Sequence, residues 1–357
     1  MKAMLCKEFG LPESLVLEEV DGLAPGPKEV LISVKACGVN FPDTLIIQGK
    51  YQYKPDLPFS PGGEVSGVVK QIGSEVSGVN VGDRVIAFST WGGFAEELVI
   101  EEERTVMISD SMGFEKASAF VLTYGTTYHA LKDRAQLRAG ETLLILGASG
   151  GVGISAVQLG KAMGATVIAA ASTAEKLAVC KKNGADHLIN YAEDDLRQCV
   201  KEITQGRGVD VIYDPVGGSF SEKAIRDMSW GGRFLVVGFA AGEIPKVPLN
   251  IPLLKGCSVV GVFWGEFTKR EPDLNKSNNQ ELMDLFDQGK ISPHIHKVYP
   301  LEQAGEALNE LENDDVIKSA MPNEMYKVFH HYKTDEWEKF NATVTDWDTS
   351  TYLDCLP

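Results

Sequence analysis

The sequence predicts an α/β protein built from a β-rich unit and a doubly wound parallel sheet. Residues 1 to about 120 contain short β-rich segments separated by turn residues, a pattern typical of a barrel or sandwich. From about Tyr124, apolar strand patterns alternate with helical patterns, which indicates parallel strands joined by helices. With 357 residues, 44% of them hydrophobic, the chain is long enough to bury two cores.

The β-rich unit is predicted from three segments with strand composition. Residues 30–36, 63–72 and 83–88 are rich in Val and Ile. Proline, glycine and aspartate mark turns at residues 25–27, 60–63 and 81–83.

The segment 141–164 predicts a strand, a glycine turn and a helix. Residues 142–146 form a continuous apolar run, as expected of a strand buried on both faces. The turn contains Gly150, Gly151, Val152 and Gly153, and Gly164 ends the helix that follows. Glycines allow a pyrophosphate to approach the backbone, and a helix N-terminus offers it free amides. The segment therefore predicts a dinucleotide site, with a glycine-rich structural turn as the alternative.

Further strands and helices follow in alternation. The predicted strands are residues 166–171, 187–191, 209–213, 233–237 and 258–262. The predicted helices are residues 126–135, 174–182, closed by Gly184, and 193–205. Beyond them we expect a helix near 281–288, a strand near 296–299 and a helix at 301–311.

Charge and composition limit which binding partners and which cellular compartment the sequence predicts. A net charge of -16 argues against binding nucleic acid or an anionic membrane through bulk electrostatics. Neither a signal peptide nor an apolar run of about 18 residues is present, so we expect a cytoplasmic protein. The six cysteines form no C-x-x-C pair and are expected to be reduced thiols.

Six segments resemble the medium-chain dehydrogenase/reductase superfamily, specifically its zinc-free quinone oxidoreductase branch. They are residues 36–43, 49–51, 57–64, 147–153, 214–218 and 237–240, in the family's order across about residues 1–310. The resemblance implies a GroES-like catalytic domain at 1–121, a Rossmann NADPH-binding domain at 122–262 and a return to the catalytic domain at 263–311. A nicotinamide cofactor would lie between the domains.

The end of the second parallel strand indicates which nicotinamide binds. An NAD site usually has Asp or Glu there, whereas this chain has Ser172. A hydroxyl can donate to a 2′-phosphate that a carboxylate would repel, and Lys176 adds a cation. The resemblance assigns Ser172, Lys176 and Tyr191 to that phosphate and so predicts NADPH. The alternative is a solvated lysine and a packed tyrosine.

The resemblance also implies the groups around the reacting atoms. Asn40 would orient the nicotinamide or the substrate, and Tyr51 would face the acceptor oxygen; a turn asparagine and a packed loop tyrosine are the alternatives. Asp43 is expected to be structural. Further cofactor contacts implied by the resemblance are Thr126, Val216, Gly238, Phe239, Ala240, Phe263 and Trp264. The last two are equally compatible with core positions.

The same segments predict no metal site. A catalytic zinc usually needs three protein ligands, and Cys37 and Glu64 alone do not make that set, because Gly63 stands where zinc-dependent relatives place histidine. Cys37 is then expected to be a core thiol.

These features together predict a zinc-independent oxidoreductase that transfers a hydride from NADPH to a small electrophilic acceptor. The acceptor would be a quinone or an α,β-unsaturated carbonyl; the alternatives are an enoyl-thioester reductase and a nucleotide-binding protein without turnover. The apolar edge strand at 258–262 would be an aggregation hazard if exposed, and the resemblance implies that it is covered in a homodimer, by pairing across a two-fold axis. Residues 312–357 resemble the C-terminal end of glutamine synthetase and predict an acidic helical tail, with no ligase activity carried over.

Overall fold

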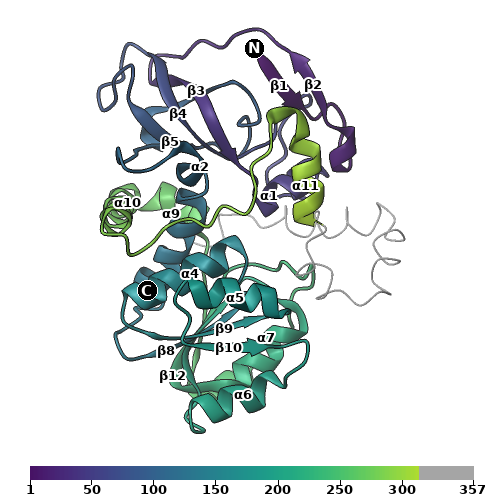
Figure 1. Cartoon of the computed structure of the whole chain (residues 1–357), viewed down its shortest axis with the longest axis vertical. Helices are drawn as coiled ribbons and strands as arrows, with labels where there is room; N and C mark the ends of the chain where they lie inside the picture. The colour runs from purple at the N-terminus through teal and green to yellow at the C-terminus, as the bar shows by residue number, and fades with distance from the viewer. Residues whose placement is uncertain (313–357) are drawn as a thin grey trace, which may run out of the picture.

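A computed structural model describes residues 1–312 and arranges them as two units, one above the other in Figure 1. The upper unit contains the antiparallel strands of the N-terminal third, and the lower unit contains a parallel sheet with its helices. The predicted α/β fold class is thereby confirmed. Apart from Glu312, the predicted tail 312–357 and its glutamine synthetase resemblance lie outside the described residues.

The upper unit holds a five-stranded sheet in the order β6-β3-β4-β5-β7 and a two-stranded sheet, β1-β2. Both sheets are antiparallel. The strands are β1 (Lys2–Leu5), β2 (Val16–Glu19), β3 (Glu29–Gly38), β4 (Glu64–Ile72), β5 (Arg84–Phe88), β6 (Glu97–Glu101) and β7 (Thr105–Met107). At one end of the β3–β4 pair, Gly38 stands opposite Glu64, and this register places Asn40 near Glu64.

The last described helix, α11 (Ala304–Glu312), returns to the N-terminal unit and lies beside β1 and α1 (Phe41–Ile46) in Figure 1. Ala304 and Leu308 are buried in one cluster with Met4 and Ile46. The Asn309 side chain also donates to the Glu13 carboxylate at 2.9 Å. Residues from both ends of the described chain therefore share one core.

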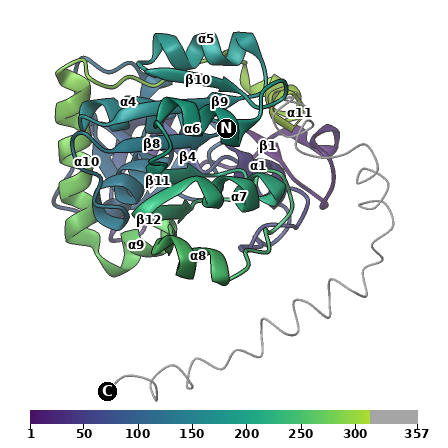
Figure 2. The ribbon, with the colours of Figure 1, turned by 90° about the horizontal axis from the view of Figure 1, so that it is seen from below.

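The lower unit is a six-stranded parallel sheet in the order β10-β9-β8-β11-β12-β13. This is the 3-2-1-4-5-6 order of a doubly wound dinucleotide-binding fold, and Figure 2 shows most of its strands stacked edge to edge. The strands are β8 (Thr142–Leu146), β9 (Thr166–Ala171), β10 (His187–Asn190), β11 (Val209–Asp214), β12 (Met228–Val236) and β13 (Ser258–Gly261).

Helices cover both faces of this sheet. Leu143 and Ile145 of β8 belong to one buried cluster, and Leu144 and Leu146 belong to another, so alternate side chains point to opposite faces. The first face is covered by α4 (Gly151–Ala162) and α5 (Ala174–Lys182), and the second by α6 (Leu196–Ile203), α7 (Gly218–Ala224) and α8 (Asn250–Lys255). Burial on both faces explains why these strands read as continuous apolar runs.

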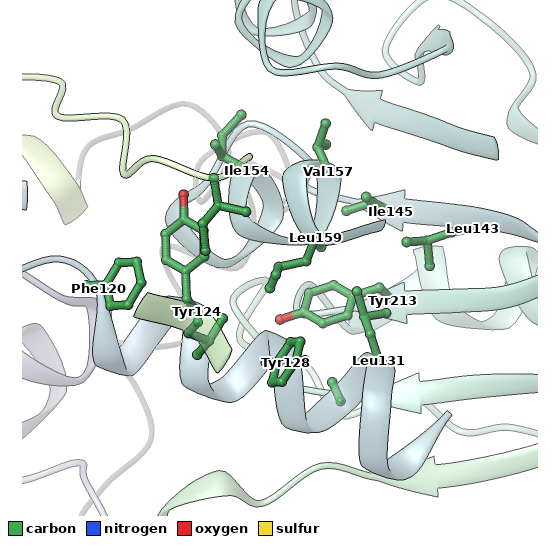
Figure 3. Close-up of a cluster of buried hydrophobic side chains, with 14 of the residues drawn as sticks. Phe120, Tyr124, Tyr128, Leu131, Leu143, Ile145, Ile154, Val157, Leu159 and Tyr213 are labelled. Carbon is green, nitrogen blue, oxygen red and sulfur yellow. The ribbon is translucent and has the colours of Figure 1, made fainter. Parts of the chain in front are cut away.

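A helical segment from Val121 to Arg134 leads from the upper unit into the lower one. It consists of η3 (Val121–Gly125), α3 (Thr126–Tyr128) and η4 (His129–Arg134), of which η3 and η4 have π-helical hydrogen bonding. Figure 3 shows Phe120, Tyr124, Tyr128 and Leu131 packed against α4 and the sheet. The Tyr213 hydroxyl lies 2.9 Å from that of Thr127, which ties the segment to the sheet.

The structure differs from the sequence-based expectations at three places. Residues 296–299 form no strand, and the prediction for this segment is wrong. The helix predicted at 193–205 starts only at Leu196, because the Asp195 side chain caps it by accepting the amide of Gln198. The helix expected near 281–288 is the end of a longer helix, α10 (Pro272–Asp287).

The other short elements connect these units. They are η1 (Pro12–Ser14), η2 (Glu102–Arg104), α2 (Phe114–Ala117), η5 (Ile225–Asp227), α9 (Trp264–Arg270) and η6 (Leu301–Gln303). Across residues 1–312, none of the helices has the length and apolar character needed to span a membrane.

Candidate nucleotide and acceptor site

The glycine turn joins β8 to α4 at the carboxyl edge of the sheet. Gly147 has a φ of +58°, a left-handed conformation that favours glycine. A β-carbon at Gly153 would lie 2.7 Å from the carbonyl carbon of Ala148 and closer still to the Gly147 oxygen. Strand and helix can approach only because this residue has no side chain. Gly150 is the N-cap of α4, and the amide of Ile154 makes a helical bond to its carbonyl, so the amides of the first turn face outward.

Ser172, Lys176 and Tyr191 lie at the same edge. Ala171, the last residue of β9, pairs with Asn190 of β10, so Ser172 and Tyr191 follow neighbouring strand ends. Ser172 is 7% exposed, and its Oγ has no hydrogen-bond partner within the described part of the chain. Lys176 belongs to the first turn of α5, and its amide donates to Thr173 Oγ1. All three residues thus follow the ends of two neighbouring strands, Lys176 through the first turn of α5.

A buried hydroxyl without a partner is a group that a ligand can satisfy. The Ser172 hydroxyl, the outward amides of α4 and the Lys176 cation have the chemistry that a phosphorylated dinucleotide requires. The residues therefore fit a nicotinamide dinucleotide.

The carboxyl ends of β11 and β12 carry Val216 and residues 238–240. Val216 is buried, and its amide donates to Asp214 Oδ1 at 2.9 Å. Asp214 also accepts the amide of Gly217 and the hydroxyl of Ser221, and burial raises its pKa. The Ala240 amide donates to the Pro215 carbonyl at 3.0 Å, which holds the two strand ends together. Asp214 begins the segment 214–218, but no local sequence pattern predicts that it organises this turn.

Gly238 and Phe239 complete this strand end. The Gly238 amide donates to the carbonyl of Asp214, and a β-carbon there would lie 3.3 Å from the Pro215 oxygen. The Phe239 side chain is 38% exposed, so it is accessible to a ligand.

Phe263 and Trp264 differ in their surroundings. Phe263 is 54% exposed at the start of α9, whereas Trp264 is 4% exposed and belongs to the main buried cluster. The Trp264 ring meets Phe88 of the upper unit edge-on, with centroids 5.2 Å apart. A β-carbon on Gly125 would lie 3.0 Å from the same ring. Trp264 therefore packs where the two units meet, and a cofactor contact by either residue stays a prediction.

Three predicted residues lie in or next to the upper unit. Asn40 is the N-cap of α1, and its amide donates to Asp43 Oδ2 at 2.8 Å. Tyr51 is half-buried in the loop after α1, with the Tyr53 ring 6.0 Å away. Burial, chiefly, raises the pKa of the Tyr51 phenol, so it remains a hydrogen-bond donor. Thr126 is half-buried at the start of α3, in the segment that connects the units.

Two carboxyl groups lie buried near Asn40. Asp43 is 2% exposed, and burial raises its pKa to about 7 although the amides of Asn40, Gly62 and Gly63 stabilise its ionised form. Glu64 is fully buried, accepts the Leu122 amide through Oε1 at 3.0 Å, and has its pKa raised by burial to about 8. Glu64 lies in the predicted strand segment 63–72, a pattern that does not reveal its contact with Leu122.

The residues near Cys37 do not fit a catalytic zinc. Burial and the neighbouring Asp43 and Glu64 hold the pKa of the Cys37 thiol well above its usual range. Residues 1–312 contain no group of three or more His, Cys, Asp or Glu side chains that could hold a metal ion.

Comparisons with known proteins identify the family. Residues 26–110 match the alcohol dehydrogenase GroES-like domain family and residues 151–286 the zinc-binding dehydrogenase family. A third match, to the glutamine synthetase catalytic domain at 269–352, is weak and lies partly outside the described residues.

Whole-chain relatives are more informative. The chain is 38% identical to a quinone oxidoreductase-like protein 2 homolog of Nematostella vectensis, over 86% of this chain and 84% of the relative. It is 36% identical to the quinone oxidoreductase of Homo sapiens, over 86% and 92% of the two chains. The structure of Escherichia coli quinone oxidoreductase complexed with NADPH superimposes with a TM-score of 0.81 at 31% identity, covering 87% of this chain and 96% of that one. The chain belongs to the quinone oxidoreductase family of the medium-chain dehydrogenase/reductase superfamily.

Proposed function

We propose that the protein is a cytosolic, zinc-independent reductase that uses NADPH to reduce a quinone or an α,β-unsaturated carbonyl. The observation that carries the choice of cofactor is the buried Ser172 hydroxyl directly after β9, which has no hydrogen-bond partner in residues 1–312 and precedes the first turn of α5 with Lys176. A carboxylate at that position would select NADH instead. Bound NADPH would supply the hydride, so the protein's own task is binding, orientation and stabilisation of charge.

Each part of the site has a defined task in this proposal. The amides of α4 hold the pyrophosphate, and Ser172, Lys176 and Tyr191 hold the 2′-phosphate. Asn40 orients the nicotinamide or acceptor, and Tyr51, kept protonated by its raised pKa, donates to the acceptor oxygen that gains charge. Thr126, Val216, residues 238–240, Phe263 and Trp264 line the nicotinamide side.

The reaction can be tested by following NADPH absorbance with a small quinone, an enone and an enoyl thioester. We expect oxidation with the quinone or the enone that is at least tenfold faster than with the thioester, because no basic patch for a carrier was found in the sequence. Turnover only with the thioester would favour an enoyl-thioester reductase. NADPH binding without turnover on any of the three would favour a non-catalytic nucleotide-binding protein.

We further propose that the enzyme is a homodimer joined along β13. This strand pairs with β12, and among the described residues it has no second neighbour. Apolar side chains are exposed around it, including Trp230 at 81%, Leu253 at 78%, Leu254 at 74% and Val259 at 49%. An apolar sheet edge of this kind is an aggregation hazard unless another strand covers it, and a second copy offers the same edge.

Val259→Asp should dissociate this dimer. A charge buried against the partner strand is expected to raise the dissociation constant at least about a hundredfold. Light scattering after size exclusion measures the mass of each variant. Leu188→Asp is the matched control, because Leu188 is 38% exposed on β10, the opposite edge strand. A Val259→Asp protein that stays dimeric, or a wild type that is monomeric, contradicts this interface.

A further inference from the structure

Asn40 and Glu64 carry two buried polar atoms with unused hydrogen-bonding capacity. Neither Asn40 Nδ2 nor Glu64 Oε2 has a hydrogen-bond partner within residues 1–312. The amide of Asn40 nevertheless lies close enough to Glu64 to stabilise the ionised carboxyl. Unsatisfied buried atoms are rare in folded proteins, and two on neighbouring side chains call for a functional explanation.

The backbone fixes this proximity. Gly38 stands opposite Glu64 in the β3–β4 register, and Asn40 follows two residues after Gly38. A β-carbon on Gly38 would lie 3.2 Å from Asn40 Nδ2 and would clash with the Ser118 carbonyl, so the chain passes tightly here. The other oxygen of Glu64 is held by the Leu122 amide. The carboxyl therefore has one fixed oxygen, with the second beside Asn40.

We propose that Glu64 is a positioning residue whose protonation state decides which end of the Asn40 side-chain amide is presented to the nicotinamide and acceptor. An ionised carboxylate can only accept, so Oε2 would take a hydrogen bond from Asn40 Nδ2 and leave Oδ1 facing the ligand. A protonated carboxyl would donate to Asn40 Oδ1 instead and leave the Nδ2 hydrogens for the ligand. This inference rests on the proposed function only in assigning Asn40 to the reacting site.

The direction of the pH effect follows from this geometry. Reduction of a carbonyl places negative charge on its oxygen, which an N–H donor stabilises and a carbonyl oxygen repels. Because burial raises the pKa of Glu64 to about 8, the carboxyl is protonated below that pH and the donor form of Asn40 prevails. Cys37 of β3 and Asp43 of α1 are the other titratable groups beside it. The active arrangement should therefore be lost as the pH rises through 8.

Glu64→Gln is the decisive variant. Glutamine keeps a carbonyl for the Leu122 amide and adds permanent N–H donors, so it mimics the protonated acid. We expect the wild-type kcat/KM for the acceptor to fall about tenfold per pH unit above the transition, and the Gln variant to show a flat profile. Asn40→Ala should lower kcat/KM roughly a hundredfold and abolish the same transition. Glu103→Gln is the matched control, because Glu103 is exposed on η2, and it should keep the wild-type profile.

A second measurement does not depend on turnover. In protein labelled with ¹⁵N-asparagine, the Asn40 side-chain amide signals, assigned from Asn40→Ala, should shift with a midpoint near pH 8 in the wild type and stay constant in Glu64→Gln. If the pH-dependent shift of the amide signals or the fall in kcat/KM persists in Glu64→Gln, the titrating group is Cys37 or Asp43. That result would overturn the inference. If the wild type does not oxidise NADPH, the proposed reductase function is refuted. The Asn40 amide signals would still show whether Glu64 controls the orientation of that side chain.

Discussion

Gly153→Ala is expected to destabilise the protein by about 1–3 kcal/mol and to weaken NADPH binding at least tenfold. The added methyl group would meet backbone atoms, the Ala148 carbonyl carbon at 2.7 Å and the Gly147 carbonyl oxygen, which cannot rotate away as a side chain does. Relief requires α4 to move away from β8, and this displaces the amides predicted to hold the pyrophosphate.

Chemical denaturation and fluorescence titration with NADPH measure these two effects. Gly22→Ala is the matched control, because Gly22 is exposed and the nearest atom to a β-carbon there is 3.8 Å away. Its stability should be unchanged or slightly increased. Ordinary stability and tight binding in Gly153→Ala would mean that α4 does not depend on this close approach.

Lys176→Glu is expected to reverse the preference for NADPH over NADH. The change replaces a cation with an anion in the first turn of α5, four residues after Ser172. A hydrogen bond to a charged group contributes about 1.5–3 kcal/mol, and repulsion between two anions adds to its loss. The ratio of kcat/KM values for the two cofactors should therefore fall at least about a hundredfold.

The measurement is the steady-state rate with each cofactor at a fixed acceptor concentration. Lys182→Glu makes the same charge change at the other end of α5, where the side chain is exposed, and should leave the ratio within about twofold. If Lys176→Glu leaves the cofactor ratio unaltered, the 2′-phosphate lies elsewhere and the assignment of Ser172 fails with it.

Much of the lower unit could be predicted because its strands are buried on both faces. The predicted strands 142–146 and 166–171 and the helix 174–182 coincide with β8, β9 and α5. Continuous apolar runs and glycine stops, such as Gly164 with φ +82°, mark such elements unambiguously. The segment 296–299 contains a single aliphatic residue, Val298, and pairs with no strand among the described residues, so it forms no ladder.

The parts of the site that depend on local sequence could be predicted. The contacts between residues far apart in the sequence could not. The glycine turn and the residues after β9 follow directly from strand ends, and Ser172 and Tyr191 come directly after two neighbouring strands. The contact between Glu64 and the Leu122 amide joins residues 58 positions apart. No pattern in a single sequence reveals such a contact, since it depends on how two units meet.

The return of α11 to the N-terminal core has a consequence for synthesis on the ribosome. Ala304 and Leu308 complete a cluster that contains Met4 and Ile46. This core therefore cannot be completed until almost all of the described chain has emerged from the ribosome. The parallel sheet uses only residues 142–261 and can fold as soon as that stretch leaves the exit tunnel. The cluster around β1 and α1 is therefore expected to close only after the parallel sheet has formed, and its apolar side chains stay accessible to chaperones until then.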